Sequence, residues 1–155
     1  MICTVRFAHL EQPPMYAAGD KITEGSFIGR MGNTGQSTAA HLHLDVVSGE
    51  VRKPWSLHEA ESGKVFPQPW ELNKFLNMGL FNALFRITTH YCDRDYQVQY
   101  GKLHTAYDVS TDKEWPWSIY WPIMPDGKVT FSGDAGAYGY CLMASFDTEE
   151  KQDED

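Results

Sequence analysis

The sequence predicts a mainly β fold of antiparallel sheets, and three observations support this class. Residues 1–10 are rich in β-branched and aromatic side chains, as expected of a strand. Residues 41–47 alternate, so that His41, His43 and Asp45 point to one face of a strand and the apolar residues between them to the other. The 13 glycines and 8 prolines are spread along the chain, which is typical of many turns between short strands.

The expected elements follow in order. The first strand ends before Pro13-Pro14, and the regularly spaced glycines of residues 18–29 indicate tight turns joining short strands. Residues 32–38 are expected to form a loop that flanks a cleft with Asn33, Thr34 and Ser37. The strand at 41–47 is followed by a segment, residues 48–66, that is expected to be irregular.

A short helix is predicted near residues 69–79, because Pro69 suits its first turn and Gly79 its C-terminal cap. Residues 80–91 fit either an apolar strand or a helix, and residues 92–100 fit a polar loop. The remaining predicted elements are a strand at 102–110, a hairpin turn at Asp126-Gly127, strands at 129–132 and 139–146, and an acidic tail at 147–155.

Composition limits the function. A chain of 155 residues is expected to form one domain with a real core. The net charge of -8, without a Lys/Arg cluster, argues against a nucleic-acid partner. The first residues lack the pattern of a signal peptide, and no apolar run reaches the roughly 20 residues of a membrane span. The three cysteines form no CxxC pair, so we expect buried free thiols rather than a cysteine metal site.

Two histidine motifs suit a zinc hydrolase. His41 and His43 share a strand face, and His104 and Asp108, four residues apart, can share a face on a straight or bent strand. A hydrolytic zinc site takes three such ligands and keeps a position open for water. Taken alone, each motif is more typical of side chains that form hydrogen bonds at a surface than of metal ligands, HxxxD being the weaker signal, and His9 alone indicates little. Their co-occurrence in a longer pattern favours the site.

That longer pattern resembles a known family. Residues 7–47 contain Phe-Ala-His-Leu, then Gly-Asp-Lys-Ile-x-x-Gly-x-x-Ile-Gly, then Gly-Asn-Thr-Gly-Gln-Ser-Thr-Ala-Ala-His-Leu-His-Leu-Asp-Val. They resemble the C-terminal half of the lysostaphin/LytM-type zinc endopeptidases of peptidoglycan, family M23. Residues 87–91, 103–109, with Ala106 where glycine is usual, 125–133 and 137–141 resemble that family's N-terminal half. Together the similar segments cover about two thirds of the chain.

The resemblance implies a role for each of five residues. His43, His104 and Asp108 would be the ligands of one Zn²⁺ ion, and His9 and His41 the two catalytic histidines that do not bind the metal. The fold implied is the family's mainly β, duplicated hybrid type with a central groove. The implied substrate is a stem or cross-bridge peptide of bacterial peptidoglycan.

The motif order departs from the family, in which the HxxxD segment comes first. Here residues 1–47 correspond to the C-terminal half and residues 87–146 to the N-terminal half, with residues 48–86 as a linker that carries the helix. We therefore predict a circular permutation within a single peptidase domain, residues 1–155. The strands at 139–146 and 2–10 should pair antiparallel and bring the two chain ends together, and the linker should pack across one face or a groove edge.

Several residues keep two interpretations. His58 and His90 lie outside the motifs, His90 being the better candidate for a groove-lining residue. Asp45 fits a partner of His43 or a surface carboxylate. The tryptophans of residues 115–121 fit either a groove wall or packing under a loop, and residues 93–95 fit a solvated loop.

We expect a monomer that acts at the bacterial cell wall, outside the membrane. With no visible export signal, release as a phage lysin or association with a virion fits this location. The alternative function is a zinc-bearing but catalytically silent module that binds cell wall or builds a phage structure. A biotinyl- or lipoyl-type carrier, prompted by the Gly-Asp-Lys-Ile pattern, would leave the histidines unexplained.

Overall fold

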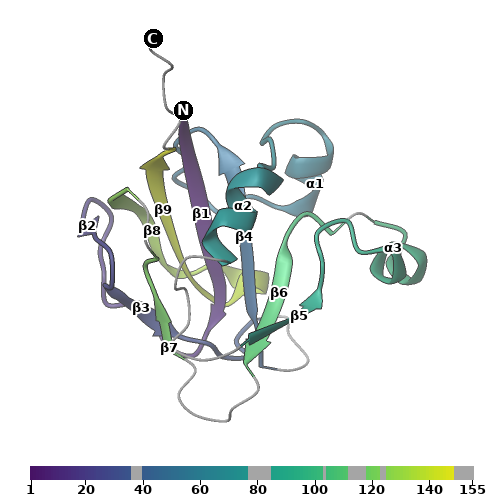
Figure 1. The fold of residues 1–155 in the computed structure, drawn as a ribbon, viewed down its shortest axis with the longest axis horizontal. Coiled ribbons are helices and arrows are strands. Elements are labelled where there is room, and N and C mark those ends of the chain that lie inside the picture. Colours follow the sequence, from purple (N-terminus) through teal and green to yellow (C-terminus); the bar gives the residue numbers. More distant parts are fainter. Residues whose placement is uncertain (36–39, 77–84, 103, 112–117, 123–124, 149–155) are drawn as a thin grey trace.

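The fold is mainly β and antiparallel, as predicted (Figure 1). The computed structural model describes residues 1–35, 40–76, 85–102, 104–111, 118–122 and 125–148. The strands are β1 (Ile2–Leu10), β2 (Lys21–Ile22), β3 (Phe27–Arg30), β4 (Leu42–Ser48), β5 (Phe85–Thr89), β6 (Tyr107–Thr111), β7 (Ser118–Tyr120), β8 (Gly127–Asp134) and β9 (Tyr140–Asp147). The helices are α1 (Leu57–Glu61), α2 (Pro69–Leu76), α3 (Arg94–Tyr100) and the 3-10 turn η1 (Gly136–Tyr138).

Seven strands form one sheet in the order β2-β8-β9-β1-β4-β6-β5, and β3 and β7 form a separate two-stranded sheet. The centre of the large sheet, β9-β1-β4, is made of the first strand and two strands far from each other in the sequence. Register sets the polar residues opposite one another: Arg6 faces Asp45 across β1 and β4, and His43 faces Asp108 across β4 and β6.

One face of the large sheet carries the main hydrophobic core. Because side chains alternate along a strand, Phe7, Leu44 and Leu142 from the three central strands all point to this face and are fully buried. Residues of β2, β3, β7 and α2 complete the same cluster.

The opposite face carries a smaller apolar cluster beside the polar residues. Ala8, Val47, Trp55, Cys141 and Met143 form this cluster. The alternation of β1 and β4 places Arg6, His43 and Asp45 on the same side as these residues. The sheet therefore separates a large stabilising core from a face on which a polar site can form.

The segment between β4 and β5 contains two helices rather than one. Residues 57–61, within a stretch expected to be irregular, form α1, which begins at a capping box made by Ser56 and Glu59. The predicted helix is present as α2, with Pro69 as its first residue and Leu72 buried in the main core. Its expected cap, Gly79, lies outside the described residues. The segment pairs with β4 through an isolated antiparallel bridge between Val47 and Pro67, and α2 packs against that strand (Figure 1).

Three local predictions are wrong. Residues 94–100 form α3 rather than a loop, because the Asp93 side chain accepts the Tyr96 N–H and Gly101 ends the helix in a left-handed conformation. The strand predicted from residue 102 begins only at Tyr107. Asp126-Gly127 is not a hairpin turn, because β7 pairs with β3 whereas β8 pairs with β2 and β9. Residues 80–91 fit either a strand or a helix, and residues 85–89 of this segment form strand β5.

The predicted pairing of the strands at the two ends of the chain is confirmed. β1 and β9 run antiparallel with Ile2 opposite Asp147. The Met1 ammonium lies 3.1 Å from the Asp147 carboxylate, and the Thr148 amide donates to the Met1 carbonyl at 2.8 Å. The acidic residues 149–155 lie outside the described residues.

The three cysteines are free, but only two match the expectation of buried thiols. Cys3 and Cys141 are buried, whereas Cys92 is exposed beside the start of α3. No helix in the described part of the chain is long and apolar enough to span a membrane.

Trp121 is a core residue, which favours the packing interpretation at this position. Its ring lies edge-on against Phe7 and Phe146, with centroids 6.4 and 6.2 Å away. Its indole N–H donates to the Pro125 carbonyl at 3.2 Å, and Gly127 leaves space that a side chain would take from the ring. Trp115 and Trp117 lie outside the described residues.

Replacing Trp121 should therefore destabilise the protein strongly. Trp121→Ala should lower the free energy of unfolding by about 3–5 kcal/mol, because it removes a large buried ring and leaves a cavity. Trp70→Ala is the matched control, since Trp70 is 73% exposed, and it should change stability by no more than about 0.5 kcal/mol. Urea unfolding monitored by far-ultraviolet circular dichroism measures both. Equal effects would contradict this account of the core.

Candidate metal centre

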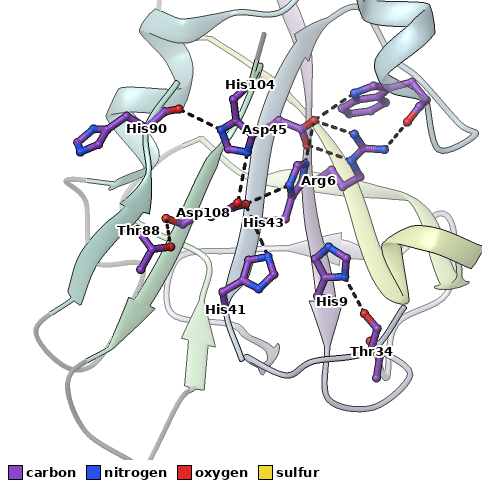
Figure 2. A network of polar contacts seen from close by, with 11 residues as sticks. Arg6, His9, Thr34, His41, His43, Asp45, Thr88, His90, His104 and Asp108 are labelled. Atoms are coloured by element: carbon purple, nitrogen blue, oxygen red, sulfur yellow. Dashed lines mark hydrogen bonds and ion pairs between the residues drawn. The ribbon is translucent and has the colours of Figure 1, made fainter. Parts of the chain in front are cut away.

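Four histidines and one aspartate come together on the polar face of the sheet (Figure 2). They are the five residues singled out by the sequence, namely His9, His41, His43, His104 and Asp108. Among the described residues, His43, His104 and Asp108 form a group whose possible ligand atoms all lie within 4.8 Å of one another. The two stretches that supply this group are separated by about sixty residues of sequence.

His43 is held between two carboxylates. Its Nδ1 lies 3.3 Å from Asp108 Oδ1, and its Nε2 lies 3.5 Å from Asp45 Oδ2. The first contact follows from the register of β4 and β6, and the second from the two-residue period of β4. Asp45 is buried, so its interpretation as a surface carboxylate is wrong.

His104 reaches the site from a loop, not from a strand. It precedes β6, and its main-chain carbonyl accepts the Cys92 N–H at 2.7 Å. Its Nδ1–H donates to the His90 carbonyl at 3.0 Å, which leaves Nε2 facing Asp108 Oδ2 at 3.3 Å. The Tyr96 ring of α3 lies against its imidazole, with centroids 4.7 Å apart. Pairing with residues 90–92 and packing under α3 therefore orient this side chain.

His9 depends on an irregularity in β1. An unbroken strand would point His9 to the same face as Phe7, into the main core. Instead the β1–β9 register shifts between Phe7 and Leu10, and His9 has a φ of 63°, in the left-handed region. Phe7 and Leu10 consequently both lie in the core, whereas the His9 ring lies 4.9 Å from His41 and 6.0 Å from His43.

Thr34 holds His9 in this conformation. The His9 Nδ1–H donates to the Thr34 carbonyl at 2.6 Å, so the neutral ring carries its lone pair on Nε2. The Thr34 hydroxyl donates to the Leu10 carbonyl at 2.6 Å and accepts the Tyr140 N–H at 3.0 Å. Burial lowers the pKa of His9 to about 4, despite the acceptor at Thr34, so the ring is neutral at pH 7.

His41 completes the set from just before β4. Its amide donates to the Gly32 carbonyl at 3.1 Å, and its Nε2 lies 3.7 Å from Asp108 Oδ1. The imidazoles of His9 and His41 thus stand side by side, and that of His41 lies next to the Asp108 carboxylate.

The electrostatics of the cluster favour a cation. Burial alone would raise the pKa of the Asp108 carboxyl, but the His104 and His43 imidazoles hold it well below its usual range. Burial opposes charge on His43, and the attraction of Asp45 and Asp108 overcomes it, which raises the pKa of His43 to about 9. The buried carboxylate of Asp45 and the partly buried carboxylate of Asp108 thus create a negative potential at the His43 imidazole between them.

The residues fit a zinc ion. Asp108 Oδ1 is buried and has no hydrogen-bond partner among the described residues, although two imidazole nitrogens lie within 3.7 Å of it. Such an orphaned buried oxygen requires an explanation, and a bound cation would supply one. Two imidazoles and one carboxylate are donors that zinc accepts in hydrolytic sites, where a fourth position stays open.

Three contributors to the site were missed from the sequence: Arg6, Trp55 and Tyr138. The guanidinium of Arg6 pairs with Asp45. The Tyr138 ring lies 5.5 Å from His43 and 6.3 Å from His9. Arg6 did carry a signal, because it is the only charged Lys, Arg, Asp or Glu side chain in the buried segment Ile2–Leu10.

The remaining candidates lie outside the cluster or act through their main chain. His58 is an exposed residue of α1. The His90 ring lies against Tyr107, and only its carbonyl reaches a site residue, His104. Asp93 caps α3 instead of lying in a solvated loop. Asn33 is exposed beside Thr34, and Ser37 lies outside the described residues.

Comparison with known proteins gives one match. Residues 3–54 match the sequence model of peptidase family M23, and this segment contains His9, His41 and His43. It spans about a third of the chain and does not reach His104 or Asp108. No curated protein and no solved structure matches the chain. The match supports a relationship to M23 peptidases.

The loop of Thr34 packs against the turn before β9, and this contact generates a prediction. A methyl group on Gly139 would clash with the Thr34 hydroxyl and main chain, and Gly139 has φ 68° and ψ -148°, which only glycine adopts readily. Gly139→Ala should therefore cost about 3–5 kcal/mol of stability.

The control is Gly101→Ala, with a similar φ of 70° but nothing within 4 Å of the added methyl. It should cost only about 1–2 kcal/mol. Thermal unfolding of both variants, with histidine NMR signals as a probe of the site, measures the difference. A His9 signal that shifts in the Gly101 variant and not in the Gly139 variant would contradict the account of Thr34.

Proposed function

We propose that this protein is a zinc-dependent endopeptidase of the M23 type that hydrolyses stem or cross-bridge peptides of bacterial peptidoglycan. One observation carries the proposal: two distant segments bring His43, His104 and Asp108 together as a possible metal-binding group, in which one buried Asp108 oxygen has no hydrogen-bond partner among the described residues. The match of residues 3–54 to an M23 peptidase model supports the reaction class.

In this proposal His43, His104 and Asp108 hold the ion through Nδ1, Nε2 and the carboxylate. A bound zinc ion lowers the pKa of a water molecule toward about 7 and polarises the carbonyl of the scissile bond. The three side chains are already oriented by Asp45, by the His90 carbonyl and by the β4–β6 register. Little reorganisation is needed to bind the ion.

The other two histidines move protons and stabilise charge. His9 keeps a lone pair on Nε2, because its Nδ1–H is committed to Thr34. It can accept the proton of the attacking water and deliver it to the leaving amine. His41, next to Asp108, is placed to donate a hydrogen bond to the oxyanion that develops on the scissile carbonyl.

We also propose that the chain is a circularly permuted relative of the family. The motif order is rotated, and antiparallel pairing of β1 and β9 supports a cut in the hairpin that would join these strands. Under this proposal residues 48–86 are the linker that reconnects the two halves of a single domain. We further propose a monomer that acts on cell wall from outside the membrane, as a released phage lysin or a virion-associated lysin would.

Metal binding is the first test. The chelator-treated protein should take up one Zn²⁺ per chain, measured by elemental analysis after dialysis and by competition with a zinc indicator. His104→Ala should weaken binding by more than the roughly 10- to 100-fold expected when only a residue that orients a ligand is lost. His58→Ala is the control and should bind zinc normally, because His58 is exposed on α1.

Hydrolysis is the second test. The zinc-loaded protein should release soluble peptide fragments with new amino termini from purified peptidoglycan. His9→Ala and His41→Ala should each lower the rate by about 10²–10⁴-fold while retaining zinc, as expected for loss of proton transfer or oxyanion stabilisation. No release from several wall chemotypes by the zinc-loaded protein would favour the silent binding module instead.

The permutation has its own test. In the test variant a short Gly/Ser linker joins Thr148 to Met1, and new chain ends are made after the exposed turn residue Gly63. This variant should fold and bind zinc. Such ends at exposed turns are tolerated because few buried hydrogen bonds are lost. Opening the same joined chain after Thr4, inside the buried strand β1, should prevent folding. Circular dichroism and zinc titration report the result, and failure of the Gly63 variant would argue against the permuted arrangement.

A further inference from the structure

We propose that Arg6 and Asp45 are positioning residues that fix the His43 imidazole with Nδ1 facing the metal. This inference rests on the proposed function of the site and deepens it. The two residues stand opposite each other on the central strands β1 and β4, behind His43 as seen from the Asp108 carboxylate (Figure 2).

The pair is buried and has bidentate geometry. Arg6 Nε donates to Asp45 Oδ1 at 3.0 Å and Nη2 donates to Oδ2 at 2.7 Å, with both residues at most 2% exposed. The third guanidinium nitrogen, Nη1, donates to the Trp55 carbonyl at 2.6 Å. Such a fork-to-carboxylate contact fixes the plane of the carboxylate as well as its position.

Aromatic rings close both sides of the guanidinium. Its central carbon lies 4.0 Å from the Trp55 ring centroid and 3.9 Å from that of Tyr138. The Trp55 indole N–H also donates to Asp45 Oδ2 at 3.2 Å. Asp45 is therefore held directly by Arg6 of β1 and by Trp55 of the segment after β4, and Tyr138 of η1 packs against the Arg6 guanidinium.

Asp45 in turn faces His43. Its Oδ2 lies at ion-pair distance, 3.5 Å, from His43 Nε2, a buried atom that has no hydrogen-bond partner among the described residues. A proton on Nε2 directed at Asp45 leaves the lone pair on Nδ1, the atom that lies 3.3 Å from Asp108. The fixed carboxylate thus selects both the ring orientation and the tautomer that can bind a metal.

Stability alone does not account for this pair. Replacing a buried ion pair by apolar side chains of similar volume is often neutral or stabilising, because burial removes both charges from water. A pair placed instead against the imidazole of a metal ligand increases the basicity of that ligand. Asp45 lies between Arg6 and His43, as expected of a pair that orients a metal ligand and increases its basicity.

The test compares two double variants by metal affinity. Arg6→Met with Asp45→Leu removes the buried pair without leaving an unpaired charge. It should fold and bind Zn²⁺ about 10- to 100-fold more weakly than the wild type in indicator competition. Lys21→Met with Asp126→Leu, which removes an exposed pair separated by 3.2 Å, should leave zinc affinity unchanged. A folded Arg6/Asp45 variant with wild-type affinity would overturn the inference and leave the proposed function standing.

A measurement on the unaltered protein keeps the test decisive if that variant does not fold. Long-range ¹H–¹⁵N NMR spectra of the zinc-loaded wild type should show His43 with its proton on Nε2 and the metal on Nδ1. A proton on Nδ1 would overturn the inference even though zinc is bound. Failure of the wild type to bind zinc at all would instead overturn the proposed function, and the inference with it.

Discussion

The buried ion pair between Arg6 and Asp45 is the interaction on which the rest of the site depends. It joins the two central strands at one register, Arg6 opposite Asp45, and the next cross-strand pair on the same face of the sheet is Ala8 opposite His43. A slip of one residue would move these side chains to the other face and leave a buried charge unpaired, at a cost of about 3–5 kcal/mol. The electrostatics that specify the strand pairing therefore also specify the position of the proposed metal ligand.

The sheet divides stability and chemistry between its faces. Apolar side chains fill the core face and stabilise the fold. The opposite face, with its smaller apolar cluster, can therefore carry polar residues. His9 is the exception to the alternation, since a regular strand would bury it in the core. Its left-handed φ costs on the order of 1–3 kcal/mol. Three hydrogen bonds around Thr34 offset that strain, which ties the geometry of one imidazole to the loop that follows β3.

These features explain what could be predicted from the sequence. Strand periodicity is local, so the shared face of His41, His43 and Asp45 and the course of β1, β4 and β9 could be inferred. The orientation of the site's side chains depends on contacts that are distant in the sequence. The His90 carbonyl orients the His104 ring, and Arg6, 39 positions away, orients the Asp45 carboxylate. α1 and α3 were missed because they are short and owe their starts to Ser56 and Asp93, whose capping contacts outweigh weak helical periodicity.

The strand pairing also explains how the proposed permutation would leave this site intact. His9, His41 and His43 come from one contiguous segment, and His104 and Asp108 from another, and the two meet through the β4–β6 pairing. β1 stays in the centre of the sheet because β4 and β9 flank it through hydrogen bonds, whichever covalent connection joins them. The entropic cost of closing a loop grows only slowly with its length. A connection between β9 and β1 can therefore be replaced by one between β4 and β5 while the side-chain contacts of the site stay the same. The contacts between the strands, rather than the order of the motifs, define the proposed centre.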